Sequence, residues 1–147
     1  MPDGLQIKQV YGFIFDPEGR VLIFEDEGKF NLPGGRPEHQ ETISETLVRE
    51  VMEEVQVEIS VPQYLGFQRV ESNDVFAQIR MIAKINHIFP SAIDPSSGRK
   101  YSRFLVPPSQ LNALLQWGTS GEKQIQSAIA LASKLGIKWK GTKGISI

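Results

Sequence analysis

The chain has 147 residues, with 16 basic and 17 acidic side chains and a formal net charge of -1. This length matches one ordinary domain with a sizeable core, so we expect a single domain over residues 1–147. A nearly neutral chain has no global attraction for nucleic acid or an anionic membrane, which favours a small-molecule partner over a nucleic-acid polymer. Cysteine is absent, which excludes disulfide bridges and thiolate metal sites.

The N-terminal segment MPDGLQIKQV is polar and mixed in charge. It lacks the basic stretch followed by an apolar run that is typical of an export signal. No apolar stretch approaches the roughly 20 residues that a membrane helix requires. We therefore expect a cytoplasmic protein with no membrane partner.

The first predicted elements are two short strands and a glycine loop. Val10–Phe15 and Val21–Glu25 are rich in β-branched and aromatic residues and flank the turn-forming segment DPEGR, which predicts a β-hairpin. Pro33–Gly35 follows the hairpin and reads Pro-Gly-Gly, a sequence that continues neither a strand nor a helix. A loop is therefore expected directly before the next element.

An amphipathic helix is predicted to begin after that loop. Thr42 and Glu45 have the spacing at which each side chain caps the backbone N–H of the other residue. At 3.6 residues per turn, one broad arc of this helix is apolar and is expected to pack on a core. The arc consists of Ile43, Leu47, Val48, Val51, Met52 and Val55.

The opposite arc of the same helix is acidic. Glu50, Glu53 and Glu54 are spaced so that they are neighbours on the helix surface, with Arg49 beside them. Clustered hard oxygen ligands suit Mg²⁺ or Mn²⁺, which bind through a few carboxylates together with substrate phosphates. On the helix alone, a solvated charged face is the simpler interpretation.

The remainder of the chain predicts more strands, a long loop and two further helices. Tyr101–Val106 is a strand in this interpretation, and the segments around it are assigned from their periodicity and turn residues. These segments are a short strand Val57–Val61, a hairpin of Tyr64–Glu71 and Val75–Ile85, a loop Asn86–Lys100, a short helix Ser109–Trp117, a break Gly118–Gly121, a helix Glu122–Leu135 and an extended or mobile tail Gly136–Ile147. Strands interspersed with helices indicate helices layered on a sheet.

Joined to the glycine loop, the acidic helix resembles the signature of a known family. The spacing of Gly35, Glu41, Arg49-Glu50-Val51, Glu53-Glu54 and Val57 is similar to the signature box of the Nudix hydrolases. Gln56 stands where the family has a glycine at the end of the helix, and we expect it to alter the helix exit slightly without removing a ligand. The resemblance implies an α/β/α sandwich with a mixed β-sheet between helices.

The resemblance also implies a reaction. Nudix enzymes typically use a divalent metal to hydrolyse the pyrophosphate linkage of a nucleoside diphosphate joined to another group. It implies that Glu50, Glu53, Glu54 and the carbonyl of Gly35 bind the metal, and we favour Glu53 for acting on the attacking water. Arg49 and Glu41 resemble the supporting pair that orients the catalytic glutamates. An ordinary surface ion pair is the alternative for Arg49.

Several basic residues are candidates for binding the substrate phosphates. Arg36, Arg99 and Lys100, with Arg103 as a further option, carry cations able to form charge-assisted hydrogen bonds. Solvated surface charge is the alternative for each of them. Phe13, Phe30 and Phe76 are candidates for stacking on a base, although aromatic residues in strands are more often part of the core.

Some Nudix enzymes take their general base from a later loop. Here that loop offers Asp94 and no glutamate, which weakens the assignment. Asp74 and Glu122 are further options, but isolated carboxylates of this kind are more often solvated. His39 and His87 are far apart in the sequence, and neither is interpreted as a metal ligand.

Two other functions compete with hydrolysis. A catalytically inactive Nudix-fold module that binds a nucleotide or polyphosphate would be favoured by loss of a box glutamate, and none is lost. A related isomerase would usually need a catalytic cysteine, which this chain lacks. The sequence leaves open which nucleoside diphosphate derivative is the substrate, and it leaves the oligomeric state open, with a homodimer as one option.

Overall fold

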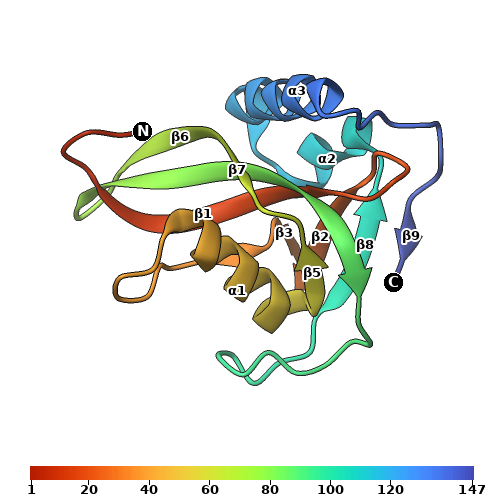
Figure 1. Cartoon of the computed structure of the whole chain (residues 1–147), viewed down its shortest axis with the longest axis horizontal. Helices are drawn as coiled ribbons and strands as arrows, with labels where there is room; N and C mark the ends of the chain where they lie inside the picture. Colours follow the sequence, from red (N-terminus) through yellow and green to blue (C-terminus); the bar gives the residue numbers. More distant parts are fainter.

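A mixed, nine-stranded β-sheet runs through the computed structural model, which describes residues 1–147 (Figure 1). Its strands are β1 Gln6–Phe15, β2 Val21–Asp26, β3 Lys29–Asn31, β4 Gly34–Gly35, β5 Val57–Ile59, β6 Gln63–Glu71, β7 Val75–Ile88, β8 Ser102–Val106 and β9 Ile145–Ser146. The central order is β5-β7-β1-β2-β8-β9, with β3 paired to β2, β4 to β1 and β6 to β7.

Both predicted hairpins are present in the sheet. β1 and β2 pair antiparallel with Phe15 opposite Val21, and β6 pairs antiparallel with β7 along most of its length. β1 and β7 lie side by side and parallel, with Val10 opposite Ile79. This parallel pair forms the middle of the sheet and makes it mixed.

Three helices cover the sheet: α1 Ile43–Val55, α2 Pro108–Leu115 and α3 Gly118–Lys134. The predicted capping box at the start of α1 is formed, because the Thr42 hydroxyl accepts from the Glu45 N–H and the Glu45 carboxylate accepts from the Thr42 N–H. α1 therefore begins directly after the glycine loop.

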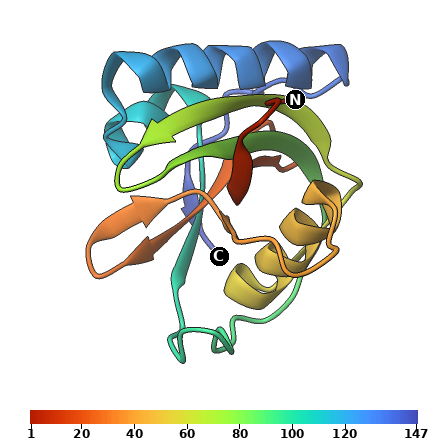
Figure 2. The same cartoon turned by 90° about the vertical axis from the view of Figure 1, so that its left-hand side faces the viewer.

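The helices lie on opposite faces of the sheet, with α1 on one side and α2 and α3 on the other (Figures 1 and 2). Each face has its own buried cluster. Leu47, Val51 and Val55 of α1 pack in the first cluster, while Leu111 of α2 and Ile125 of α3 pack in the second. The predicted α/β/α sandwich with a mixed sheet is confirmed.

The Pro-Gly-Gly segment was predicted to continue no strand, but Gly34–Gly35 forms the short strand β4, because it pairs with Val10 and Tyr11 of β1. Two predicted boundaries were also wrong. α3 begins at Gly118, so Gly118–Gly121 forms its first turn and does not break it. A Cβ at Gly121 would overlap the side chains of Asn112 and Trp117, so glycine here permits the close packing of α2 against α3. β7 continues to Ile88, within the predicted loop, because Ile88 pairs with Val57 of β5.

The apolar arc of α1 is narrower than predicted. Leu47, Val51 and Val55 are fully buried, whereas Val48 is 39% exposed and Met52 is 37% exposed. The sheet covers a single stripe of the helix, and residues at the edge of the arc remain in contact with solvent.

The C-terminal segment was predicted to be either extended or mobile, and its last residues are extended in strand β9. β9 pairs with β8, with Ile145 opposite Leu105. Among the helices, none combines the length and the apolarity needed to cross a membrane.

Candidate active site

The glycine loop, Pro33–Gly35, lies between strand β1 and the helix α1. Gly34 lies opposite Tyr11 and Gly35 lies opposite Val10, and the Gly12 N–H donates to the Pro33 carbonyl at 3.1 Å. A methyl group at Gly34 would collide with the Val10 carbonyl oxygen. A methyl group at Gly35 would overlap the carboxyl group of Glu50. The two glycines therefore allow the loop to approach β1 on one side and a carboxylate of α1 on the other.

Glu54 lies against this loop from the side of α1. Its Oε1 accepts a hydrogen bond from the Gly34 N–H at 3.1 Å. Burial raises the pKa of Glu54 to about 8, and the charges of Glu50, Asp94 and Asp26 act in the same direction. Burial also raises the pKa of Glu50, against the opposing effect of Arg49. The site thus concentrates negative charge that the protein compensates only in part.

Arg49 is the centre of an ion-pair network in the site. Its Nε donates to Glu41 Oε2 at 2.7 Å and its Nη2 donates to Glu41 Oε1 at 3.0 Å. Its Nη1 donates to Glu50 Oε1 at 2.9 Å and to Glu53 Oε2 at 3.3 Å. Nη2 also donates to the Arg36 carbonyl at 2.9 Å. One guanidinium group therefore fixes two of the three clustered glutamates and joins them to the glycine loop.

Glu41 is itself held from several directions. Its Oε1 accepts from the Thr46 hydroxyl at 2.8 Å and from the Glu38 N–H at 2.9 Å. The hydrogen bond from Arg49 is the main cause that lowers the pKa of Glu41 to about 2. Glu41 thus remains charged and anchors Arg49.

Asp94, on the loop that follows β7, is close to the acidic cluster. It is only 6% exposed, and its Oδ1 accepts from the Ser96 N–H at 2.9 Å. Its charge contributes to raising the pKa of both Glu50 and Glu54. The sequence named Asp94 as a weak option, and the structure brings it to the same region as the glutamates.

Gln56 takes over the conformation expected of the family glycine. It ends α1 in the left-handed region, with φ 54° and ψ 45°. Its Nε2 donates to the Glu53 carbonyl at 3.0 Å, and its Oε1 accepts from the Ala92 N–H at 2.9 Å. Its carbonyl accepts from the Phe89 N–H at 3.0 Å. The substitution therefore preserves the helix exit and also ties the loop of Asp94 to the end of α1.

The predicted phosphate-binding residues lie in different settings. Arg36 has an exposed side chain directly after the glycine loop. Arg99 is paired with Asp26 at 3.0 Å and Glu27 at 3.1 Å, and Lys100 is exposed.

The prediction that Arg103 could bind the substrate phosphates was wrong. It is only 4% exposed, and its Nη1 donates to the carbonyls of Val55 and Phe89 at 2.9 Å each. Its side chain therefore joins the end of α1 to the following loop inside the protein.

Two other carboxylates lie away from the cluster. Asp74 pairs with Lys8 at 2.8 Å at the tip of the β6–β7 hairpin. Glu122 belongs to α3, across the sheet from α1 (Figure 2).

The three phenylalanines predicted as candidates for stacking on a base also lie in different settings. Phe13 is buried in the core, and Phe76 lies beneath the ammonium group of Lys8. Phe30 lines a cavity.

Arg80, which was not among the residues predicted from the sequence, lines the same cavity as Phe30. Arg80 stands between Ile79 and Met81 in an apolar strand and is only 7% exposed. A charge within an otherwise apolar strand was the available signal, because such a residue is rarely buried without a specific reason.

The donor set of the site fits a divalent cation. Glu50, Glu53 and Glu54 offer carboxylate oxygens beside the backbone of Gly35, and such hard oxygen donors suit Mg²⁺ or Mn²⁺. No three acidic or histidine side chains converge closely enough to enclose an ion as they stand. Arg49 instead holds Glu50 and Glu53, whereas Glu54 has a raised pKa, so a cation bound there would take the place of its proton.

Comparison with known proteins decides the family. A family model described as the NUDIX domain matches residues 6–125, which include the glycine loop, α1 and Asp94. The chain belongs to the NUDIX domain family. This confirms the family predicted from the box. A search of curated proteins gave no match.

Solved structures of this family share the fold at low sequence identity. The Bacillus subtilis pyrophosphohydrolase BsRppH is 19% identical, with 94% of this chain and 89% of that chain covered and a TM-score of 0.73. A MutT protein from Methanosarcina mazei is 18% identical, with 94% and 100% covered and a TM-score of 0.60. A UDP-X diphosphatase is 13% identical, with 94% and 67% covered and a TM-score of 0.66.

Proposed function

We propose that this Nudix protein is a divalent-metal-dependent hydrolase that cleaves the pyrophosphate linkage of a nucleoside diphosphate joined to another group. The observation that carries the proposal is the juxtaposition of Glu54 and Gly34 beside the Arg49 network. Carboxylates from α1 lie directly against the backbone of the glycine loop, and one arginine restrains two of them. The names of a pyrophosphohydrolase and a diphosphatase among proteins of the same fold agree with this chemistry.

In this proposal, Glu50, Glu53, Glu54 and the Gly35 carbonyl hold the metal. A bound Mg²⁺ or Mn²⁺ would neutralise phosphate charge, polarise a phosphoryl oxygen and lower the pKa of a coordinated water. The protein contributes the restraint of the ligands, because a carboxylate fixed by a second group loses less freedom when it binds.

Glu53 is our choice for orienting the attacking water. Its side chain is 31% exposed, compared with 17% for Glu50, so it is the more accessible of the two glutamates that Arg49 holds. Arg49 and Glu41 act as positioning residues, because they contact the glutamates and the loop. Arg36, Arg99 and Lys100 are proposed to meet the phosphates, with Arg36 best placed because its backbone is fixed by Arg49.

The experiment is a hydrolysis panel with matched variants. Nucleotide sugars, dinucleotides, dinucleoside polyphosphates and oxidised nucleotides are incubated with Mg²⁺ or Mn²⁺, and the products, phosphate monoesters or pyrophosphate, are separated and quantified by ion-exchange chromatography. Glu53→Gln and Glu54→Gln should each lower kcat by more than the roughly 10–100-fold typical of residues that only support a metal ligand. Glu58→Gln, an exposed glutamate on β5, serves as the control and should keep full turnover.

Circular dichroism should show that all three variants retain the fold. Turnover unchanged by Glu53→Gln or Glu54→Gln would remove that residue from the site. A wild-type protein that binds nucleotides but hydrolyses none of the panel would instead be a binding module.

A further inference from the structure

A cavity of about 180 Å³ lies on the α2–α3 face of the sheet, where Leu115 and Trp117 contribute to its lining. It is lined by aromatic rings and a few polar side chains, as is typical of a site for a flat organic group. Its lining includes Tyr11, Phe30, Asn31, Gln78, Arg80 and Trp117.

Arg80 is the one buried charge in this lining. Its Cζ lies 5.2 Å from the ring centre of Tyr11 and 5.0 Å from that of Trp117, so the guanidinium contacts two aromatic rings. Its Nε donates to Gln124 Oε1 at 3.0 Å and its Nη2 donates to Gln78 Oε1 at 3.1 Å. Its Nη1 is buried and has no hydrogen-bond partner. No carboxylate pairs with it.

The groups around Arg80 help to stabilise its buried positive charge, but they provide no acceptor for its Nη1. Two rings and two amide oxygens compensate part of the cost of burial. A buried N–H without an acceptor remains unfavourable, and in native proteins such a group requires a specific reason. An acceptor supplied by a ligand is one such reason, because the cavity adjoins the side chain that carries the free donor.

The cavity is connected to the proposed reaction centre through Tyr11. Tyr11 pairs with Gly34 in the sheet, and Gly34 is the donor to Glu54. The Tyr11 ring also lies against Gly34, because a methyl group at Gly34 would overlap the ring carbon Cδ1 of Tyr11. A substrate with its diphosphate at the glycine loop would therefore direct its next group towards this cavity.

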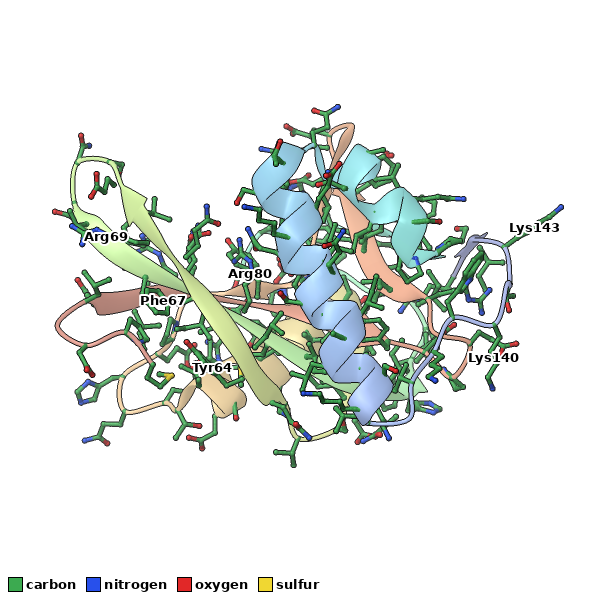
Figure 3. The ribbon with its side chains drawn as sticks, turned by 90° about the horizontal axis from the view of Figure 1, so that it is seen from above. Tyr64, Phe67, Arg69, Arg80, Lys140 and Lys143 are labelled. Atoms are coloured by element: carbon green, nitrogen blue, oxygen red, sulfur yellow. The ribbon has the colours of Figure 1, made fainter.

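The size of the cavity favours one ring system over a whole nucleotide. Sites that enclose a complete small ligand measure roughly 300–1,000 Å³. Behind Arg80, a second cavity of about 300 Å³ lies between β6 and α3 and is lined by Phe67, Lys123 and Gln124. Figure 3 shows Arg80 beside α3, to which it is joined by the hydrogen bond to Gln124. The aromatic lining and the link to Gly34 favour the first cavity as the binding site.

We propose that Arg80 determines base specificity by donating a hydrogen bond from Nη1 to the carbonyl oxygen of a keto-bearing nucleobase held among Tyr11, Phe30 and Trp117. The inference rests on the proposed function, since it places the diphosphate of the same substrate at the glycine loop. An amino group at that position of the base would place donor against donor, so adenine is disfavoured. Nη1 is covered in the present arrangement, so this hydrogen bond requires the neighbouring side chains to turn aside when the base binds.

The test compares two substrates that differ by one functional group. Hypoxanthine carries an oxygen where adenine carries an amino group, so inosine and adenosine diphosphate derivatives with the same leaving group form a matched pair. We expect wild type to favour the inosine substrate by at least about 10-fold in kcat/KM. Arg80→Met should bring the ratio to within about twofold, mainly by slowing the inosine substrate, because the donor is lost.

Two further variants separate recognition from structure. Arg80→Lys keeps a cation but lacks the planar fork, so it should give an intermediate ratio and carries the test if Arg80→Met does not fold. Arg69→Met is the matched control, because Arg69 is exposed on β6 and pairs only with Glu71. It should leave the ratio unchanged. Replacing an incompletely paired buried charge by an apolar chain should leave Tm equal or higher.

Calorimetric binding of inosine and adenosine monophosphates gives a readout that does not need turnover. Selective binding of the inosine nucleotide that Arg80→Met abolishes supports the inference even if no substrate is hydrolysed, in which case the proposed function fails alone. Equal loss on both substrates, or no base preference in wild type by either method, overturns the role of Arg80.

Discussion

The carboxylate oxygen Oε1 of Glu54 lies 3.1 Å from the backbone nitrogen of Gly34 and accepts a hydrogen bond from its N–H. This single hydrogen bond only partly offsets the burial of the carboxylate, so the pKa of Glu54 rises from its ordinary 4.5 to about 8. The protonated form is therefore favoured in the folded, metal-free protein. Metal binding would require the proton to leave.

Glu54→Gln should change how stability depends on pH in the metal-free protein. With its folded pKa raised, Glu54 contributes stability that is fully present below about pH 4.5 and is lost as pH rises through about 8. Wild type should thus lose stability from pH 5 to 9, by up to about 1.4 kcal/mol for each pKa unit. Gln cannot ionise, so the variant should equal wild type near pH 5 and exceed it at pH 9.

Urea unfolding in EDTA at both pH values measures this difference. Glu58→Gln should follow the wild-type curve, since Glu58 is exposed on β5. Addition of Mg²⁺ at pH 8 should stabilise wild type more than Glu54→Gln. Parallel curves for wild type and Glu54→Gln would show that this carboxylate is not the group that titrates.

Glu41→Gln should destabilise the protein at neutral pH and lower the turnover of the proposed hydrolysis. The pKa of Glu41 is lowered to about 2, chiefly by Arg49, so its stabilising effect is fully present above about pH 4.5 and is lost as pH falls through about 2. The stability gap between wild type and Glu41→Gln should therefore be largest at pH 7 and narrow below pH 4.5. Turnover should fall roughly 10–100-fold, because Arg49 loses the anchor with which it orients Glu50 and Glu53.

A double-mutant cycle with Arg49→Lys checks the pairing. A coupling energy between positions 41 and 49 of about 0.5–3 kcal/mol at pH 7 is expected for directly bonded residues. Additive effects of the two substitutions would show that the ion pair seen between Glu41 and Arg49 does not act as a unit.

The two glycines of the loop should respond differently to alanine. A methyl group at Gly34 meets the backbone of β1 at the Val10 carbonyl, which cannot move without disrupting the pairing of β1 with β4. Gly34→Ala should cost about 1–3 kcal/mol of stability. A methyl group at Gly35 meets only the end of the Glu50 side chain, which can swing aside. Gly35→Ala should therefore keep stability near wild type while lowering Mg²⁺ affinity and turnover.

Thermal unfolding and Mg²⁺ titration of both alanine variants test this contrast. Gly28→Ala is a useful reference, because Gly28 has open space around it but a positive φ of 81°, so it reports the backbone penalty without any clash. Normal Mg²⁺ affinity and turnover in Gly35→Ala would separate Glu50 from the proposed metal site.

Features that depend on neighbours in the sequence could be predicted from the sequence. The capping bonds of Thr42 and Glu45 and the acidic face of α1 arise from residues within a few helical turns of each other. Their spacing therefore predicts the helix, whereas the proposed chemistry depends on the resemblance of the whole box to a known family. The hairpins likewise follow from local alternation and turn residues.

Features that depend on distant segments could not be predicted. Arg103 and Arg99 have the same charge and lie four residues apart, yet Arg103 caps carbonyls inside the protein while Arg99 pairs at the surface. Asp94 lies on the loop after β7, which is tied to the end of α1 by Gln56 and Arg103, two residues far from it in the sequence or on another element. The partners of Arg80 come from β1, α3 and the segment after α2, and no local pattern specifies such a meeting.

Gln56 should combine a conformational penalty with a tethering role, and two substitutions can separate them. A residue other than glycine in the left-handed region costs about 1–2 kcal/mol, which Gln56→Gly would relieve. The same change removes the side-chain bonds to the Glu53 carbonyl and the Ala92 N–H, each worth about 0.5–1.5 kcal/mol. The two effects should nearly cancel in global stability. Gln56→Ala keeps the penalty and loses the bonds, so it should be destabilised by about 1–2 kcal/mol.

Gln116 provides the matched control for the backbone effect. It ends α2 in the same conformation, with φ 58°, and its exposed side chain makes no hydrogen bond. Gln116→Gly should therefore stabilise the protein by about 1 kcal/mol, and the difference from Gln56→Gly isolates the tether. Amide hydrogen exchange over residues 89–94 should accelerate in both Gln56 variants and stay unchanged in Gln116→Gly, because Gln56 bonds this loop and Gln116 does not. Unaltered exchange in Gln56→Gly would mean that Arg103, which also contacts Phe89, holds the loop without help from Gln56.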